Sequence, residues 1–520
     1  MNAIGQWALY LALGASALGG WTAISGGVLR RRALVRFGAW GVHGATVLLA
    51  LALAALGRAL WRSDFSVRYV ASFSSLVVPH AYQVGALWGG PAGSLLVWAL
   101  CVAAVASVAM MAHRRTLADR WGVFVGTLGA VVAALAAATA FAGNPFALLA
   151  TEVRDGRGLD PVLQSPWMLL HPPLLLLGTA ATLPLFASAI AALAARRLDA
   201  QWRSVARAWA LVAWMLLVAG VVVGMRWAYT EPGWGGYWAW DPVEVAGAIP
   251  LAVLGVFVHV ARRERTPAIE LAVLALAPFP LTLAGAWVAH GDTLRSLHAF
   301  VQSDAGPAFA VIAGVAAAAA IGLLASRRAW LASLQPVDEP GGASAADAAA
   351  PRRGVASLTS RLSLAGIILF AIASAVMPLR REQDAVVMSG GSAVVRDLFG
   401  RPWTFTSQGT SRYAHNNFYI NAASFVVTTG GRRVGILTTE ERQPFDVDEN
   451  ELAPPVVGVG FRASLLQDVQ VQLLEASGGV ARVRIRFWPL ASFLWIGGAL
   501  VVLAALLSLA AGPGGEADAR

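Results

Sequence analysis

Apolar stretches alternate with short polar connections along most of the chain. Stretches of about 20 apolar residues, the length a helix needs to cross the ~30 Å hydrocarbon layer, are centred near residues 15, 50, 102, 131, 180, 214, 253, 278, 316, 370 and 500. This pattern predicts an all-α polytopic membrane protein with about 11 transmembrane helices. No basic leader precedes the first stretch, residues 7–25, so we interpret it as the first of these helices.

Residues 380–487 follow a different pattern, in which apolar and polar positions alternate with a period of two. Two hairpins are predicted there, residues 424–439 turning at Gly430-Gly431 and residues 469–487 turning at Gly478-Gly479. The alternation indicates a small extracytoplasmic β-rich domain between the last two helices. Because two hairpins alone are marginally stable, we expect this domain to pack on the membrane part or on another protein.

These patterns divide the chain into consecutive parts. The predicted order is a membrane core at 1–333, a cytoplasmic linker rich in Ala, Pro and Gly at 334–360, a transmembrane helix at 361–379, the β-rich domain at 380–487, and a final transmembrane helix with a cytoplasmic tail at 488–520. Only 13% of the residues are charged, about half the fraction found in soluble domains, roughly 25%. The low charge supports the membrane assignment.

The net charge is +10, all of the Lys and Arg positions are arginine, and many of these arginines gather in alternate connections between the apolar stretches. The clusters include Arg30, Arg31, Arg32, Arg36, Arg114, Arg115, Arg120, Arg196, Arg197, Arg203, Arg207, Arg262, Arg263, Arg265, Arg327, Arg328, Arg352 and Arg353. By the positive-inside rule these connections face the cytoplasm, which places the N-terminus outside and the C-terminus inside. Membrane topology therefore explains the positive charge, and the distribution of arginines is not typical of a nucleic-acid-binding protein.

The chain contains a single cysteine, Cys101, which lies in an apolar stretch. One thiol excludes an internal disulfide, a Cys-rich zinc site and a thiol-exchange motif within this chain. It also excludes the Cys-x-x-Cys-His attachment site, so the protein is not itself a c-type cytochrome.

The most distinctive segment is an aromatic outer loop rich in glycine. Residues 227–244 read WAYTEPGWGGYWAWDPVE. Glycine lets the backbone approach a flat ligand closely, and indole rings offer rigid apolar faces for a planar macrocycle. An interfacial aromatic belt is the alternative, but a belt scatters its aromatic residues over many helix ends. We therefore predict a cofactor-binding platform containing Trp227, Trp234, Gly235, Gly236, Tyr237, Trp238, Trp240 and Asp241.

Histidines flank this loop in the sequence and lie on the same predicted side. His171 and His298 are placed to act as a bis-axial pair for haem iron, although each alone would be read as a polar interface residue. His290 is a weaker candidate to replace one of them. A planar guanidinium matches a carboxylate with two hydrogen bonds, so the outer arginines are candidates to bind haem propionates, or else simple interface anchors. They are Arg157, Arg226 and Arg295.

At this point the sequence resembles the CcmF-type haem lyases of the CcmF/CcmC/CcsA superfamily. The tryptophan-rich WGGYWAWDPVE is the superfamily's signature, and further matching motifs occur in order along nearly the whole chain. They are DFSVRYVA at 64–71, ALWGG at 86–90, GSLLVW at 93–98, NPF at 144–146, GRGLDPVLQ at 156–164, HPPLL at 171–175 and SLHAF at 296–300.

The resemblance implies cytochrome c biogenesis in a bacterial or organellar cytoplasmic membrane. Such a protein receives b-type haem as its substrate from a haem chaperone, binds it on the tryptophan-rich platform, and promotes thioether attachment to CxxCH apocytochromes. Apocytochrome c and its thiol-reducing and recruiting partners are the implied partners. We expect the protein to act by positioning, so no side chain is assigned an acid–base role.

The resemblance also assigns metal ligands. His171 and His298 match the family's external haem ligands, and His259 matches one of its paired membrane histidines. The helix expected to supply the second membrane histidine reads RLSLAGIILF at 361–370 and has none, which puts a second, internal haem b in doubt.

Other classes of function remain open on the sequence alone. A non-catalytic haem carrier would share the platform, and the large β-rich domain favours the lyase over this carrier. A secondary transporter fits less well, because the sequence shows no inverted repeat and no charged pair within the apolar stretches.

Overall fold

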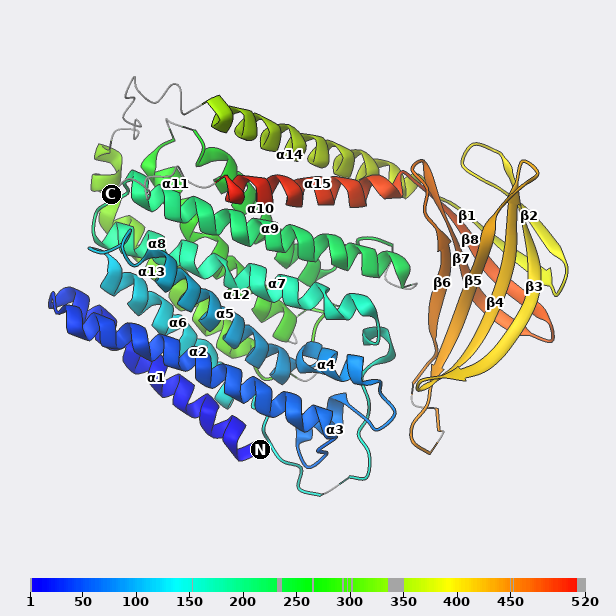
Figure 1. Ribbon diagram of the computed structural model, residues 1–520, viewed down its shortest axis with the longest axis horizontal. Helices are drawn as coiled ribbons and strands as arrows, with labels where there is room; N and C mark the ends of the chain where they lie inside the picture. Colours follow the sequence, from blue (N-terminus) through cyan, green and yellow to red (C-terminus); the bar gives the residue numbers. More distant parts are fainter. Residues whose placement is uncertain are drawn as a thin grey trace.

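The computed structural model describes residues 2–151, 153–231, 236–263, 266–291, 294–296, 298–300, 303–334, 350–448, 450–451 and 453–511. Trp234 and Gly235 of the predicted platform lie outside these residues, as do most of the predicted linker and the end of the predicted tail. Long helices form one body and a curved sheet covers one end of it (Figure 1).

Apolar segments form helices because a helix satisfies its own backbone hydrogen bonds, as the membrane interior requires. The α-helices are α1 (Asn2–Val28), α2 (Arg32–Trp61), α3 (Arg68–Phe73), α4 (His80–Gly89), α5 (Pro91–His113), α6 (Trp121–Phe141), α7 (His171–Ala180), α8 (Thr182–Ala194), α9 (Ala200–Thr230), α10 (Pro242–Val260), α11 (Ala268–Leu276), α12 (Pro278–His290), α13 (Gly306–Ser333), α14 (Ala350–Val376) and α15 (Ala491–Ala510). Three short 3₁₀ turns accompany them, η1 (Pro161–Leu163), η2 (Pro166–Leu169) and η3 (Met377–Leu379).

Among the described residues, 11 helical segments are long and apolar enough to cross a membrane, which confirms the predicted number. Two of these spans are interrupted. Pro166–Ala194 comprises η2, α7 and α8, and Ala268–His290 comprises α11 and α12. Pro278 begins α12 at the second interruption, where a proline lacks the N–H that would continue the helix.

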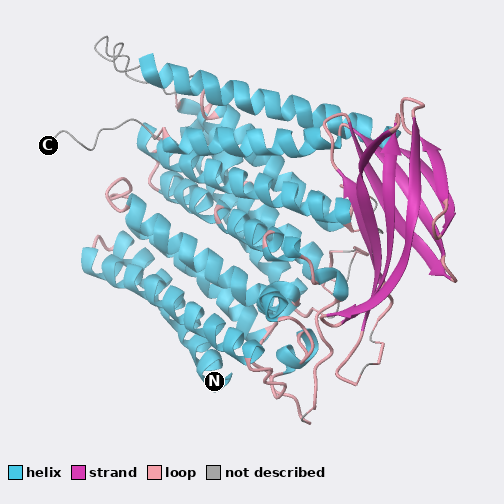
Figure 2. Ribbon diagram, turned by 45° about the vertical axis from the view of Figure 1, so that its right-hand side comes forward, coloured by secondary structure: helices cyan, strands magenta, loops and turns pink. Residues whose placement is uncertain are grey.

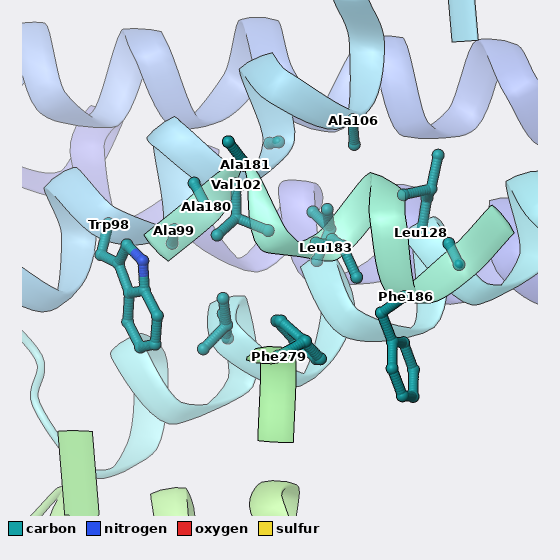
Figure 3. Close-up of a cluster of buried hydrophobic side chains, with 14 of the residues drawn as sticks. Trp98, Ala99, Val102, Ala106, Leu128, Ala180, Ala181, Leu183, Phe186 and Phe279 are labelled. Carbon is teal, nitrogen blue, oxygen red and sulfur yellow. The ribbon is translucent and has the colours of Figure 1, made fainter. Parts of the chain in front are cut away.

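Small residues let the helices approach one another in the core. Ala99, Val102, Ala180 and Leu183 are fully buried where α5 meets α7 and α8 (Figure 3). The rings of Phe186 and Phe279 pack 5.2 Å apart between α8 and α12. Close packing of small side chains is the usual basis of helix association in a membrane, because lipid offers no hydrophobic driving force between helices.

One arginine from the predicted cytoplasmic clusters is buried at the end of the helix bundle opposite the sheet. The side chain of Arg120 has 0% exposure and forms two hydrogen bonds of 3.1 Å to the carboxylate of Asp199. It also donates to the Arg197 carbonyl at 3.0 Å. Burial by itself raises the pKa of Asp199, but the hydrogen bonds from the Trp202 N–H and Arg120 lower it overall. Arg120 therefore links the connection before α6 to the connection before α9, in addition to any role in membrane topology.

The strands form an antiparallel eight-stranded sheet in the order β1-β8-β7-β6-β5-β4-β3-β2. The strands are β1 (Arg381–Met388), β2 (Ser392–Arg396), β3 (Pro402–His415), β4 (Phe418–Thr429), β5 (Arg432–Pro444), β6 (Val456–Arg462), β7 (Gln467–Ser477) and β8 (Val480–Pro489). We call residues 381–489 the β-domain. Its edge strands approach one another, and Gln383 of β1 donates to the Arg396 carbonyl of β2 at 2.7 Å. The sheet is therefore nearly closed into a barrel (Figure 2).

Both predicted hairpins are confirmed. β4 pairs with β5 around Gly430-Gly431, and β7 pairs with β8 around Gly478-Gly479. The φ angles are +56° and +74° at the first turn and +58° and +79° at the second. Positive φ at both central residues is the tight hairpin turn that glycine adopts without strain.

The β-domain packs on the membrane part, one of the two predicted partners, through buried polar contacts. The Tyr229 hydroxyl at the end of α9 donates to Asp468 at 3.1 Å, and the Gln470 amide donates to the Tyr229 carbonyl at 2.9 Å. Arg442 of β5 reaches Glu231 at 3.3 Å. Trp488, at the end of β8, is buried against Tyr229 with ring centroids 5.5 Å apart. These contacts hold the sheet at one end of the helix bundle (Figure 2).

The pair formed by Glu231 and Arg442 predicts a pH-dependent stability. Burial raises the pKa of Glu231 to about 7, although Arg442 acts in the opposite direction. The folded pKa lies above the ordinary value of 4.5. Glu231 therefore contributes stability that is fully present below pH 4.5 and lost as pH rises through about 7. The free energy of unfolding of the detergent-purified protein is therefore expected to fall by on the order of 2 kcal/mol between pH 5 and pH 8, as measured by thermal unfolding.

Glu231→Gln is expected to remove most of this pH dependence, because the amide does not ionise. Asp448→Asn is the matched control, since Asp448 forms an exposed pair with Arg154 across the same boundary. An unchanged pH profile in Glu231→Gln would show that another group is responsible.

Candidate functional site

A cavity of about 880 Å³ lies between the helix bundle and the β-domain. Its wall is formed by the end of α3, by α4, α5, α7, α9, α10 and α12, by the loops at 157–168 and 298–300, and by three β-domain residues, Asn417, Pro444 and Ala453. Pockets of roughly 300–1,000 Å³ hold most small-molecule ligands and cofactors. The wall is mainly apolar, with a few polar side chains that include both predicted haem-ligand histidines.

His171 is held in one orientation at the start of α7. Its Nδ1 lies 2.8 Å from the Gly220 carbonyl oxygen, and its ring meets Trp227 edge to face at 6.0 Å. A hydrogen bond from Nδ1–H to a carbonyl fixes the tautomer in which Nε2 can bind a metal. The imidazole lies directly on Gly224 of α9, where the Cβ of any other residue would overlap the ring. Gly224 therefore makes room for this histidine.

His298 reaches the cavity from the loop after α12. Its Nδ1 lies 3.4 Å from an Asp241 carboxylate oxygen, which also accepts a 2.5 Å hydrogen bond from Ser296. A carboxylate beside one ring nitrogen is the usual way to orient a metal-binding imidazole. The structure thus brings His171 and His298 to the wall of the same cavity.

The Asp-Pro-Val-Glu end of the aromatic motif is the N-terminal cap of α10. Asp241 accepts from the Val243 N–H at 2.9 Å, and the Glu244 side chain accepts from the Asp241 N–H at 3.2 Å. This reciprocal capping box satisfies N–H groups at the helix start. Asp241 therefore has two roles, because it also contacts the loop that carries His298.

The aromatic residues of the predicted platform occupy different places. Trp227, Tyr237 and Trp238 line the cavity. Trp240 meets Trp238 edge to face at 6.0 Å but is 78% exposed and is not part of the cavity wall. Gly236 lies against Trp488 of the β-domain. Trp234 and Gly235 lie outside the described residues.

The three arginines predicted to bind propionates also lie in different places. Arg157 lies on the cavity wall. The Arg226 guanidinium lies 4.5 Å from the centre of the Phe461 ring in the β-domain and 5.3 Å from that of Trp495 in α15. Arg295 is exposed. The structure therefore places Arg226 and Arg295 off the cavity wall.

His259 does not line this cavity. It sits in the last turn of α10, beyond Pro250, the last residue of that helix on the cavity wall. At 1.5 Å per residue, the two positions are about 13 Å apart along the helix. The His259 Nε2 lies 3.0 Å from the Arg263 guanidinium. Within the described residues, no group of three or more His, Cys, Asp or Glu side chains surrounds it or any other point. An internal haem at His259 stays a prediction.

Several residues of the cavity wall were predicted weakly or were not predicted as site residues. His290 is buried, bonds Ser303 through Nδ1 at 2.8 Å, and packs 4.6 Å from the Phe300 ring. Gln164 and Asn417 line the cavity from a loop and from a strand turn that are far apart in the sequence. Gln164 belongs to a motif that the resemblance identified, whereas Asn417 and Gly224 stand in no motif.

The chain is similar to known proteins of cytochrome c biogenesis. The family model "Cytochrome C assembly protein" matches residues 88–286, which include His171 and the aromatic motif. The cytochrome c-type biogenesis protein CcmF of Pseudomonas aeruginosa is 38% identical over 273 residues, 52% of this chain and 41% of that protein. CcmF of Escherichia coli is 36% identical over 317 residues, 59% of this chain and 48% of that protein. The chain thus spans about half the length of the curated relatives it matches.

The fold has a match among solved structures that covers nearly the whole chain. A structure named Cytochrome c Heme Lyase CcmF superposes with a TM-score of 0.76 and 21% sequence identity, over 97% of both chains. That similarity shows a shared fold, which in the described part of this chain comprises 11 helices long enough to cross a membrane and an eight-stranded sheet before the last of them. The chain is therefore similar in sequence to CcmF proteins over its membrane core, and it shares the fold of the solved CcmF structure over nearly its whole length.

Proposed function

We propose that this protein binds haem in the outer cavity and promotes its thioether attachment to CxxCH apocytochromes. The observation that carries the proposal is the position of His171 and His298 on one cavity wall, together with Trp227, Tyr237 and Trp238. Two oriented imidazoles suit the axial positions of haem iron, and indole faces suit a porphyrin ring. Haem is the substrate here, and we propose that it arrives from a haem chaperone.

The residues fit such a substrate. The Gly220 carbonyl leaves Nε2 of His171 as the metal-binding atom, and Asp241 lies beside Nδ1 of His298. Arg157 is the one predicted arginine on the cavity wall, which makes it our candidate for a propionate partner. The roles of Arg226, Arg295, Trp234 and Gly235 as haem contacts stay predictions.

The chain would act by positioning. Two thiols of the apocytochrome add across the two vinyl groups of haem, with each S–H supplying one sulfur and one hydrogen, so the addition itself is redox-neutral. Holding the vinyl carbons and the thiols together converts a slow bimolecular reaction into an effectively unimolecular one. The histidine of CxxCH would then displace His171 or His298 from iron and release the product.

A topology with the N-terminus outside and the C-terminus inside is part of the proposal. The Asn2 side chain donates to the Phe146 carbonyl at 2.8 Å, which places the chain start beside an outer loop. α15 begins where β8 ends and runs through the bundle to its opposite end (Figure 1). The first and last described residues therefore lie at opposite ends of the helix bundle.

Two tryptophans of one motif provide a matched test of the proposal. Trp238→Ala is expected to lower the haem content of purified protein about tenfold, because it removes an aromatic face from the cavity wall. Trp240→Ala is the control and is expected to change haem content less than twofold, because Trp240 is exposed. Haem stoichiometry and cytochrome c yield measure both variants. Equal haem content and yield in Trp238→Ala and the unaltered protein would contradict the platform.

A non-catalytic haem carrier is the second candidate. The absence of histidine from residues 361–370 favours it, since the resemblance associates the lyase with a second membrane histidine. The β-domain residues on the cavity wall favour the lyase, because they give the site a second surface that a carrier does not need. Binding of a CxxCH peptide by the purified protein separates the two candidates.

A further inference from the structure

Exposed leucines project from the edge of the β-domain where it joins the membrane part. Leu465 and Leu466, in the turn between β6 and β7, are 58% and 59% exposed, and Leu379, just before β1, is 69% exposed. The hairpin turns at Gly430-Gly431 and Gly478-Gly479 carry no such side chains. We call Leu379, Leu465 and Leu466 the leucine rim. Exposed apolar side chains gathered in one place mark a surface that contacts something other than water.

Two hydrogen bonds fix the β6–β7 turn at the start of the last membrane span. The Leu490 N–H donates to the Leu466 carbonyl at 2.8 Å, and the Ser492 hydroxyl donates to the Ser464 carbonyl at 2.8 Å. Ser492 belongs to the first turn of α15, a helix long and apolar enough to cross a membrane. Ser464 and Leu466 therefore lie at the level where this helix enters the bilayer.

The strand register places Leu379 at the same edge. Arg381 of β1 is opposite Phe487 of β8, and Pro489 of β8 is opposite Gln467 of β7. The residues just before β1 and just before β7 therefore lie on either side of the end of β8, from which α15 continues (Figure 1). Leu379 is also the last residue of the membrane span that contains most of α14. Two membrane spans thus reach the membrane boundary at the leucine rim.

Arginine side chains beside the leucine rim match the lipid headgroup region. Arg380 and Arg462 are exposed, and the Arg380 guanidinium lies 4.9 Å from the centre of the Trp488 ring. Residues 377–381 and 459–467 contain no acidic residue. Leucine side chains favour the acyl region, whereas arginine side chains keep their charge at the boundary, where the phosphates lie. A protein partner is the alternative, but it would have to displace lipid from the ends of two membrane spans.

We propose that the leucine rim inserts into the leaflet beside the β-domain, so that lipid is the partner of this surface. The β-domain then contacts the membrane directly, in addition to being joined to α14 and α15. The β6–β7 turn is followed at once by Asp468 and Gln470, whose hydrogen bonds to Tyr229 hold the sheet on the helix bundle. Lipid contact at the turn therefore helps to keep the β-domain over the cavity. The proposal does not depend on haem binding.

The test measures the depth of single fluorescent labels in vesicles of phosphatidylcholine and phosphatidylglycerol. Cys101 is the only cysteine in the chain, so Cys101→Ala gives a background in which Leu465→Cys or Leu379→Cys is labelled alone with bimane. Nitroxide groups on the acyl chains quench a label in the membrane, and aqueous iodide quenches a label in water. Both labels are expected about 5–10 Å into the boundary between headgroups and acyl chains.

Ser477→Cys is the matched control for these labels. Ser477 is exposed at the opposite end of β7, a strand of 11 residues, which puts it roughly 34 Å from the leucine rim end of the strand. The control label is expected to respond to iodide and not to the nitroxides. Thermal unfolding of each labelled protein checks that the label has not altered the fold, because all three positions are exposed.

Two results would overturn the proposal. If the labels at Leu465 and Leu379 respond to iodide as strongly as the label at Ser477, and not to the nitroxides, the leucine rim lies in water. If the reconstituted protein gives that result while the same labels are shielded from iodide in native membranes, a protein partner covers the leucine rim instead of lipid. Neither result bears on haem binding in the cavity, which is measured separately by haem stoichiometry.

Discussion

His171→Ala is expected to lower haem affinity by more than about 100-fold and to bring the yield of cytochrome c near background. Loss of a residue that merely orients a metal ligand typically costs 10–100-fold, so loss of the ligand itself should cost more. Absorption spectra and haem stoichiometry of the purified protein measure binding, and the yield of a reporter cytochrome measures function. Unchanged haem content and yield would contradict the assignment of His171.

Two further variants test the same histidine by other means. Gly224→Ala leaves His171 present but puts a methyl group where its ring lies, so it should reduce haem binding in the same direction. His80→Ala is the matched control, because His80 stacks on Trp61 at 4.5 Å and does not line the cavity. His298→Ala should resemble His171→Ala. Loss of a second haem in His259→Ala would instead establish an internal site.

Arg120→Ala is expected to destabilise the protein by about 2–3 kcal/mol. Removing the guanidinium leaves a buried space and takes two hydrogen bonds of 3.1 Å from Asp199, which keeps its contacts with Arg197 and the Trp202 N–H. It also removes the donor to the Arg197 carbonyl, which links the connection before α6 to the one before α9. Thermal or denaturant unfolding in detergent measures the loss.

Arg154→Ala is the matched control for that measurement. Its side chain is 78% exposed and pairs with Asp448 at 3.5 Å, and exposed pairs contribute about 0–1 kcal/mol. Arg120→Ala should therefore unfold well below Arg154→Ala. If the two variants unfold alike, Arg120 acts only as a topology signal.

The membrane architecture could be predicted because it depends on local composition. A run of about 20 apolar residues is helical in a bilayer whatever surrounds it, since no other structure satisfies its backbone. The hairpins at Gly430-Gly431 and Gly478-Gly479 could also be predicted, because paired glycines readily adopt the positive φ angles that a tight turn requires. The remaining strands lack such turns, so the pattern predicted β structure at 380–487 without an eight-stranded order.

The candidate site could be predicted from the sequence only in part. The aromatic motif and its flanking histidines stand out as unusual residue types, and the structure brings His171, His298 and Trp238 to one cavity. The same reasoning treated all outer arginines alike, whereas Arg226 points to Phe461 and Arg157 to the cavity. Which face of a helix a side chain occupies depends on how the helix is rotated against its neighbours, and charge alone carries no such information.

By itself, then, the sequence determined the spans, the two glycine turns and the residue types available for binding a planar ligand, because each is a property of a short segment. Only the tertiary structure decided that Gly224 makes room for His171, that Asp241 lies beside His298, and that Asn417 reaches the cavity from the β-domain. Each of these contacts joins residues from different segments. They exist because the helices and the sheet pack in one arrangement, and the free energy that selects it is distributed over the whole core.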